Sequence, residues 1–81
     1  MNVRLLNSGP YHLHAGHANV KFPVDVDGIE SGYYDGNIIC FDVRGSELER
    51  VGFTGVDIDV YYGFSLLHGD CQLIEGSENE N

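Results

Sequence analysis

We expect a mainly β (or α+β) protein: a single small antiparallel sheet, or a partly open barrel, of about five to seven short strands with one short helix near residues 46–52. Eight Val, five Ile and nine aromatic residues stand against two Ala, one Met and one Lys, a balance that favours strands over helices. Turn signals recur about every 8 to 12 residues, which is the spacing of short strands. A chain of 81 residues forms one domain, expected at residues 1–75, and residues 76–81 have the composition of an acidic flexible tail.

Three runs of the sequence predict strands. Apolar and polar residues alternate over 20–26 and again over 56–62, so each run has one apolar and one solvated face. Pro23 cannot donate a ladder hydrogen bond, which predicts an edge strand or a bulge at the first run. Residues 38–43 are apolar on both faces up to Asp42, the pattern of a central strand.

Turn signals connect these runs. Gly69-Asp70 predicts a tight hairpin between 64–68 and 71–75, and 7–10 predict a second hairpin between 2–6 and 11–14. Further turns are expected at Asp27-Gly28 and at 35–37.

The predicted helix begins with a capping box. The hydroxyl of Ser46 accepts from the amide of Glu49 in this motif, the Glu49 carboxylate reaches back, and Gly52 ends the segment. The expected core combines the inward positions of these elements: Phe22, Val24, Val26, Ile39, Phe41, Val43, Val56, Ile58, Val60, Phe64, Leu66 and Leu73.

Charge is distributed very unevenly along the chain. Residues 1–24 have no Asp or Glu and carry +2, whereas 25–81 hold all thirteen acids and two Arg, for −11. The net charge of −9 argues against direct nucleic-acid binding, in which neutralised phosphates supply most of the affinity. An acidic field attracts a basic protein and raises its association rate.

Two pairs of carboxylates lie at strand spacing. Asp25 with Asp27, and Asp57 with Asp59, would project from one strand face about 6.8 Å apart. If the two strands are close, the carboxylates would be spaced on the order of successive nucleic-acid phosphates. The alternative is that the acids keep an exposed sheet face in solution and prevent edge pairing. Candidate partner-binding residues are Asp25, Asp27, Glu30, Tyr33, Asp35, Asp57, Asp59 and Tyr61.

The tyrosine pairs 33–34 and 61–62 stand beside these acids. Tyrosine is enriched at interface hot spots, but period 2 turns one ring of each pair inward.

Metal ligation has a weak pattern, with His12, His14, His68 and Cys71 as candidates. Solvated or partly buried histidines explain the same residues, and we expect no metal and no cofactor. Cys40 and Cys71 lie in apolar runs and are expected to be free buried thiols. Asp25 to Glu30 resembles part of a calcium loop but lacks its remaining ligands. No nucleophile or phosphate-loop motif occurs, so we do not expect an enzyme.

In size, acidity and strand content, the chain resembles the small phage-encoded inhibitors of host defence, notably anti-CRISPR proteins. This resemblance is at the level of the class and rests on no motif. It implies a non-catalytic inhibitor that binds a basic, nucleic-acid-handling effector complex and blocks its nucleic-acid site. An immunity protein that neutralises a basic nuclease toxin follows the same electrostatic logic, and a His-based metal-binding regulatory module is a third hypothesis. We expect a cytoplasmic protein, in the host cytoplasm if phage-encoded, without a membrane span; the sequence leaves a homodimer open.

Overall fold

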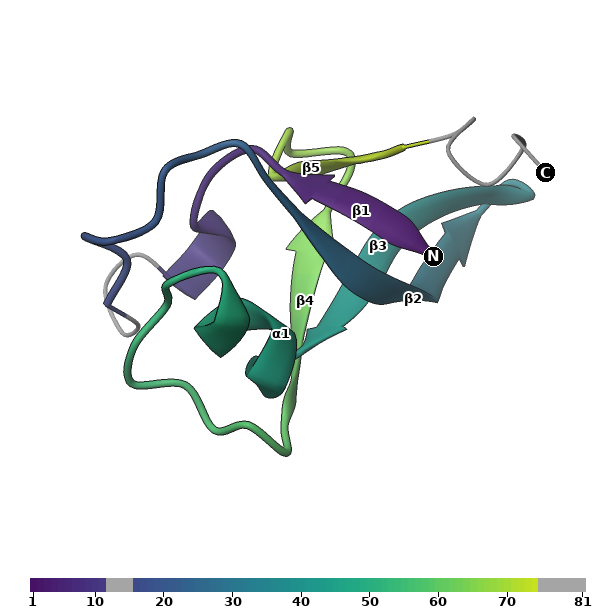
Figure 1. Cartoon of the computed structure of the whole chain (residues 1–81). Coiled ribbons are helices and arrows are strands. Elements are labelled where there is room, and N and C mark those ends of the chain that lie inside the picture. Colours follow the sequence, from purple (N-terminus) through teal and green to yellow (C-terminus); the bar gives the residue numbers. More distant parts are fainter. Residues whose placement is uncertain (12–15, 75–81) are drawn as a thin grey trace, which may run out of the picture.

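The computed structural model describes residues 1–11 and 16–74, and these form one five-stranded antiparallel sheet with a short α-helix against it (Figure 1). The elements in chain order are β1 (Asn2–Leu5), the 3₁₀ helix η1 (Gly9–Tyr11), β2 (Val24–Tyr34), β3 (Asn37–Arg44), α1 (Gly45–Arg50), β4 (Tyr61–Ser65) and β5 (Cys71–Leu73). The strand order is β4-β3-β2-β1-β5. This confirms the expected fold class. The tail expected at 76–81 lies outside the described residues.

The centre of the sheet is the β2–β3 hairpin. Its two-residue turn, Asp35-Gly36, has positive φ at both residues (54° and 79°), as a type I′ hairpin turn requires. The predicted turn at 35–37 and the central strand at 38–43 are therefore confirmed. The turn predicted at Asp27-Gly28 is wrong, because both residues lie inside β2. A Cβ at Gly28 would come within 2.9 Å of Val3 Cγ2, so glycine permits β1 to approach there.

Pro23 does not mark an edge strand. It precedes the first residue of β2, where no ladder hydrogen bond is needed, and β2 lies between β1 and β3. The hairpin predicted between 2–6 and 11–14 is also wrong as far as the structure describes it. β1 pairs with β2 and β5, and Tyr11 belongs to η1.

Strands β4 and β5 do not form the hairpin predicted around Gly69-Asp70. β4 pairs with β3 and β5 pairs with β1, at opposite ends of the strand order. Five residues join them, and the amide of Asp70 donates to Ser65 O at 2.9 Å while Leu6 donates to Asp70 O at 2.9 Å. The sheet is therefore curled so that its two outer strands approach each other at this corner.

The strand predicted over 56–62 is wrong before Tyr61. Residues 55–60 form a loop held against the start of α1, where Gly45 N donates to Val60 O at 2.7 Å. A Cβ at Gly45 would lie 1.9 Å from Asp57 O, so only glycine admits this loop. Ile58 and Val60, expected in the core, are consequently 47% and 43% exposed.

Helix α1 confirms the predicted helix but not its capping box. Arg44 occupies the N-cap position without a side-chain cap, and Ser46 already lies within the helix. Gly52 terminates the segment as predicted: the helix ends at Arg50, Val51 is its C-cap, and Gly52 follows with a φ of 118°. Gly52 N donates to Glu49 O and Phe53 N donates to Leu48 O, the two hydrogen bonds of a Schellman motif.

The core lies on the concave face of the sheet and under α1. Of the expected core residues, Val26, Phe41, Val43 and Phe64 are buried, and Phe22, Val24, Ile39, Val56, Leu66 and Leu73 are half-buried. Cys71 is buried, as expected, and five further buried residues were not in the expected core: Val3, Leu5, Val20, Leu48 and Phe53. Val3 and Leu5 lie on the short strand β1, Leu48 lies on α1, and the other two lie outside the helices and strands. Among the described residues no helix is long and apolar enough to cross a membrane.

Candidate functional site: an acidic hairpin with exposed tyrosines

The distal part of the β2–β3 hairpin, residues 29–39, extends beyond the neighbouring strands (Figure 1). β1 pairs with β2 only as far as Asp27, and β4 pairs with β3 only as far as Cys40. The last pairs of the hairpin, Tyr33 with Ile38 and Tyr34 with Asn37, therefore have no third strand beside them among the described pairings. We call residues 29–39 the distal hairpin.

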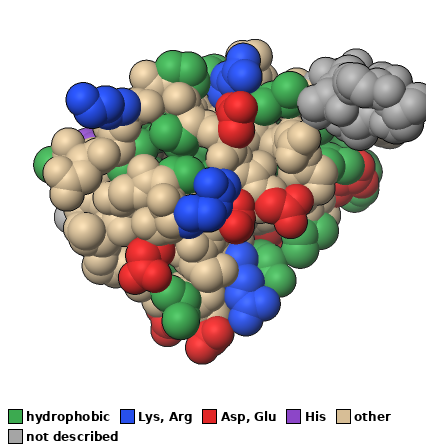
Figure 2. Space-filling model, viewed as in Figure 1, with side chains coloured by type: hydrophobic (Ala, Val, Ile, Leu, Met, Phe, Trp, Pro, Cys, Tyr) green, Lys and Arg blue, Asp and Glu red, His purple; other side chains and the backbone are tan. Residues whose placement is uncertain are grey.

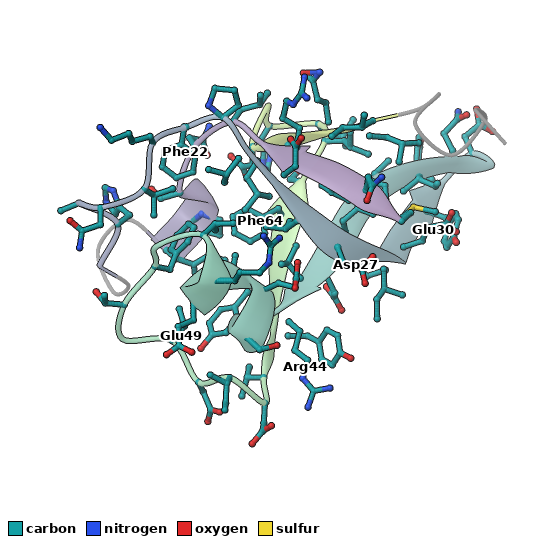
Figure 3. All side chains as sticks on the ribbon, viewed as in Figure 1. Phe22, Asp27, Glu30, Arg44, Glu49 and Phe64 are labelled. Carbon is teal, nitrogen blue, oxygen red and sulfur yellow. The ribbon has the colours of Figure 1, made fainter. Side chains whose placement is uncertain are left out.

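The distal hairpin has two acidic residues and no Lys, Arg or His. Glu30 lies where the hairpin leaves the body of the sheet, and Asp35 is in its turn. None of the ion pairs found in the described part of the chain includes either carboxylate. Figure 3 shows Glu30 at this end of the molecule, well separated from Arg44. The hairpin is thus a locally uncompensated negative surface.

Tyr33 and Tyr34 are the most exposed large side chains of the distal hairpin, at 58% and 73% exposure, and Ile29 is 52% exposed. Both rings face solvent, whereas one was expected to turn inward. The pairing register shifts on either side of Gly32, and in the part of the chain that the structure describes no third strand pairs with Tyr33 or Tyr34, so strict alternation does not apply. The Tyr33 hydroxyl donates to Glu30 Oε1. That hydrogen bond is the main reason why the pKa of Tyr33 is raised, and it holds the ring beside the carboxylate.

Asp25 and Asp27 project from β2 next to β1, and both are ion-paired. Arg4 Nε donates to Asp25 Oδ1 at 2.9 Å, and the hydrogen bond from Arg4 is the main cause of a lowered Asp25 pKa. The ammonium of Met1 lies 2.9 Å from Asp27 Oδ1. Across this face, acidic and basic side chains lie side by side (Figure 2).

Asp57 and Asp59 do not form a ladder of carboxylates with Asp25 and Asp27. They lie in the 55–60 loop, where Asp57 Oδ1 accepts from the amide of Asp59. Asp59 pairs with Arg44 at 3.2 Å. The Arg44 guanidinium also lies 5.9 Å from the ring centroid of Tyr61, which is exposed. Of the eight candidate residues, three lie on the distal hairpin: Glu30 and Tyr33, which are hydrogen-bonded to each other, and Asp35 in the turn.

Tyr61 and Tyr62 follow the expected alternation. Tyr61 faces solvent, whereas Tyr62 packs against the core and its ring lies 5.1 Å from that of Tyr11. Tyr11 was not singled out in the sequence. Its hydroxyl accepts from Gly63 N at 2.9 Å and so covers the outer edge of β4, and burial is the main cause of its raised pKa.

A carboxylate that the sequence did not mark for function connects α1 to β2. Glu47 Oε1 accepts from Arg50 Nη2 at 2.9 Å and from the amide of Asp27 at 3.0 Å. These two hydrogen bonds, the one from Arg50 first, lower the pKa of Glu47. The spacing of three residues between Glu47 and Arg50 on a helix was the available signal.

The metal candidates are not assembled by the described residues. His12 and His14 lie outside them, and His68 is an exposed residue of the turn before β5. Cys71 is buried and its thiol donates to Phe64 O at 3.5 Å; burial raises the pKa of this thiol to about 11. Cys40 and Cys71 are both free, although Cys40 is only half-buried. In residues 1–11 and 16–74 no group of three or more His, Cys, Asp or Glu side chains could hold a metal, and no cavity is found.

No protein-family model, curated protein or solved structure matches this chain.

Proposed function

We propose that this protein is a non-catalytic inhibitor that binds a basic, nucleic-acid-handling protein and blocks its nucleic-acid site through the distal hairpin. One observation carries the proposal: Glu30 and Asp35 stand on a protruding hairpin without cations, whereas Asp25, Asp27 and Asp59 are each ion-paired elsewhere. Charges without a local counter-ion contribute most to the field that a partner meets.

Electrostatics and aromatic contacts have separate roles in this proposal. The net charge of −9 steers a basic partner toward the protein and acts mainly on the association rate. Tyr33 and Tyr34 supply rigid, amphipathic area of the kind found at interface hot spots. The tyrosines therefore determine how long the complex persists, while the acids determine how fast it forms.

An inhibitor of the anti-CRISPR class is the form of this function that the resemblance in size and acidity favours. Its target surface would be one that normally holds phosphates, because carboxylates on a narrow hairpin can replace them against Lys and Arg. A nuclease toxin as the captured target would instead identify an immunity protein.

The test begins with affinity capture of the partner and its identification by mass spectrometry. Partner binding is then compared for Glu30→Lys/Asp35→Asn and for Glu78→Lys/Glu80→Gln, two variants with the same change in net charge. Asn is chosen at position 35 because it tolerates the positive φ of the turn. We expect the hairpin variant to lose at least tenfold in affinity and the 78/80 variant to lose less than twofold.

Competition completes the test. The DNA or RNA bound by the partner should displace the protein, and the association rate should fall as salt rises, because screening at about 0.15 M already acts beyond about 8 Å. Equal binding by a hairpin variant that melts like the parent, or simultaneous binding of nucleic acid and protein to the partner, would overturn the proposal.

A further inference from the structure

Within residues 1–11 and 16–74, one edge of β2 has no strand beside it along the distal hairpin. On the side of β1, Gly28 N donates to Met1 O at 2.9 Å and Gly28 O accepts from the Met1 ammonium at 3.0 Å. Alternate residues of a strand present their N–H and C=O groups to the same edge, so the backbone of Glu30 faces this side as well. β2 continues to Tyr34, and the described residues provide no strand for this edge beyond Gly28.

On the β3–β4 side, the edges of the sheet are partly closed. The hydroxyl of Tyr11 accepts a hydrogen bond from the amide of Gly63 on β4. The carbonyl of Ile39 on β3 accepts one from the amide of Leu66. The edge of β2 from residue 29 to 34 is about 20 Å long, the length of an ordinary strand, and it includes the register shifts on either side of Gly32. An exposed edge of this kind can accept an added strand from another chain.

Charge complementarity indicates which kind of segment can pair with this edge of β2. A second copy carries −9 and the same Glu30 and Asp35, so pairing of two such edges would place like charges together. The chain's own residues 75–81 contain three Glu and no cation, which makes them a poor complement for the same reason. An extended segment rich in Lys or Arg fits both the free backbone groups and the carboxylates.

We propose that an extended basic segment of the partner adds to the sheet as a strand along residues 29–34 of β2, with its cations beside Glu30 and Asp35. The inference rests on the proposed function because it requires a basic partner. It adds that recognition uses backbone hydrogen bonds, with Tyr33 and Tyr34 as the flanking aromatic contacts.

The probe is a synthetic peptide in which three Lys alternate with three Val, acetylated and amidated at its ends. Two further peptides carry N-methyl groups on all the Lys amides or on all the Val amides. In a bound strand only one of these two sets points at β2, because N–H direction alternates along the chain. Charge and side chains are identical in the three peptides, so each methylated peptide is the control for the other.

Titration of the full-length, ¹⁵N-labelled protein should show binding of the unmodified peptide with shifts in the Glu30–Tyr34 amides. We expect one methylated peptide to bind at least tenfold more weakly and the other within about twofold of the unmodified peptide. The matching Glu–Val peptide should not bind, and Glu30→Lys/Asp35→Asn should bind the Lys–Val peptide at least tenfold more weakly.

The outcomes separate the inference from the proposed function. Equal binding of both methylated peptides, or no peptide binding by a protein that still captures its partner, would overturn strand addition and leave the charge-based function standing. If the parent sediments as a dimer and the Glu30→Lys/Asp35→Asn variant does not, the edge of β2 pairs with a second copy of the chain. That result would also overturn the inference. Failure of the hairpin variant to affect partner capture would overturn the proposed function itself.

Discussion

Replacement of Phe41 by Ala removes the central side chain of the core. Phe41 is 0% exposed and lies on β3, paired with Glu30 on one side and Phe64 on the other. Truncation of a buried Phe costs about 3 to 5 kcal/mol through lost burial and the cavity that remains. A domain of this length has a free energy of unfolding of roughly 4 to 12 kcal/mol, so this one change removes a large fraction of it. Urea denaturation followed by far-ultraviolet circular dichroism measures the difference.

Ile58→Ala is the informative comparison for that experiment. The sequence pattern places Ile58 in the core, but the structure places it in the 55–60 loop with 47% exposure. Complete burial of Ile contributes about 1.5 to 3 kcal/mol, so a half-exposed side chain that leaves no cavity should cost less than about 1 kcal/mol. If Ile58→Ala destabilised the protein as much as Phe41→Ala, with an unchanged denaturant slope, the result would contradict the loop at residues 55–60 and favour a strand over 56–62.

Gly45→Ala should destabilise the protein by more than about 2 kcal/mol in the same denaturation assay, because its Cβ would overlap Asp57 O at 1.9 Å; a neutral effect would contradict the close approach. The pKa values of Asp25 and Glu47 are lowered in the folded state, so their contribution to stability is present above about pH 4.5 and is lost as pH falls through the folded pKa values. The free energies of unfolding of the parent and of Arg4→Gln/Arg50→Gln, measured by urea titration at several pH values, should therefore become equal in acid. A difference between the two proteins that does not change with pH would contradict this. Cys71, with a thiol pKa of about 11, should react with iodoacetamide at pH 8 at least tenfold more slowly in the folded than in the urea-unfolded protein, measured by peptide mass spectrometry.

The fold class could be predicted because composition and turn chemistry act locally. The Asp35-Gly36 turn and the strand at 38–43 are specified by residues adjacent in sequence, and both are confirmed. The end of the helix is also specified locally, because Gly52 readily adopts the positive φ that follows a helix C-cap.

What could not be predicted depends on contacts between distant residues. The alternation of 56–62 has the period of a strand. The segment nevertheless begins as a loop, because Gly45 leaves room for its backbone and Gly45 N donates a hydrogen bond to Val60 O. Gly69-Asp70 has the composition of a hairpin turn, yet β4 pairs with β3 and β5 pairs with β1. No local signal distinguishes these outcomes, because each is decided by which strand pairing buries more of the core.

The same distinction governs the site. A sequence count of acids treats all carboxylates alike, but a carboxylate contributes to a long-range field only to the extent that no cation neutralises it. Arg4 and Arg44 come from segments far from Asp25 and Asp59 in the chain, so the ion pairs could not be anticipated from spacing.

Charge reversal at Asp25 would place Lys beside Arg4 and disturb the β1–β2 pairing, so a loss of binding in that variant would mix folding with recognition. Glu30 and Asp35 have neither of these complications, because both lie past the last contact of β2 with β1. A change of charge on the hairpin therefore leaves the ion pairs and the β1–β2 pairing in place, while Glu30→Lys also removes the hydrogen bond that Tyr33 donates to Glu30.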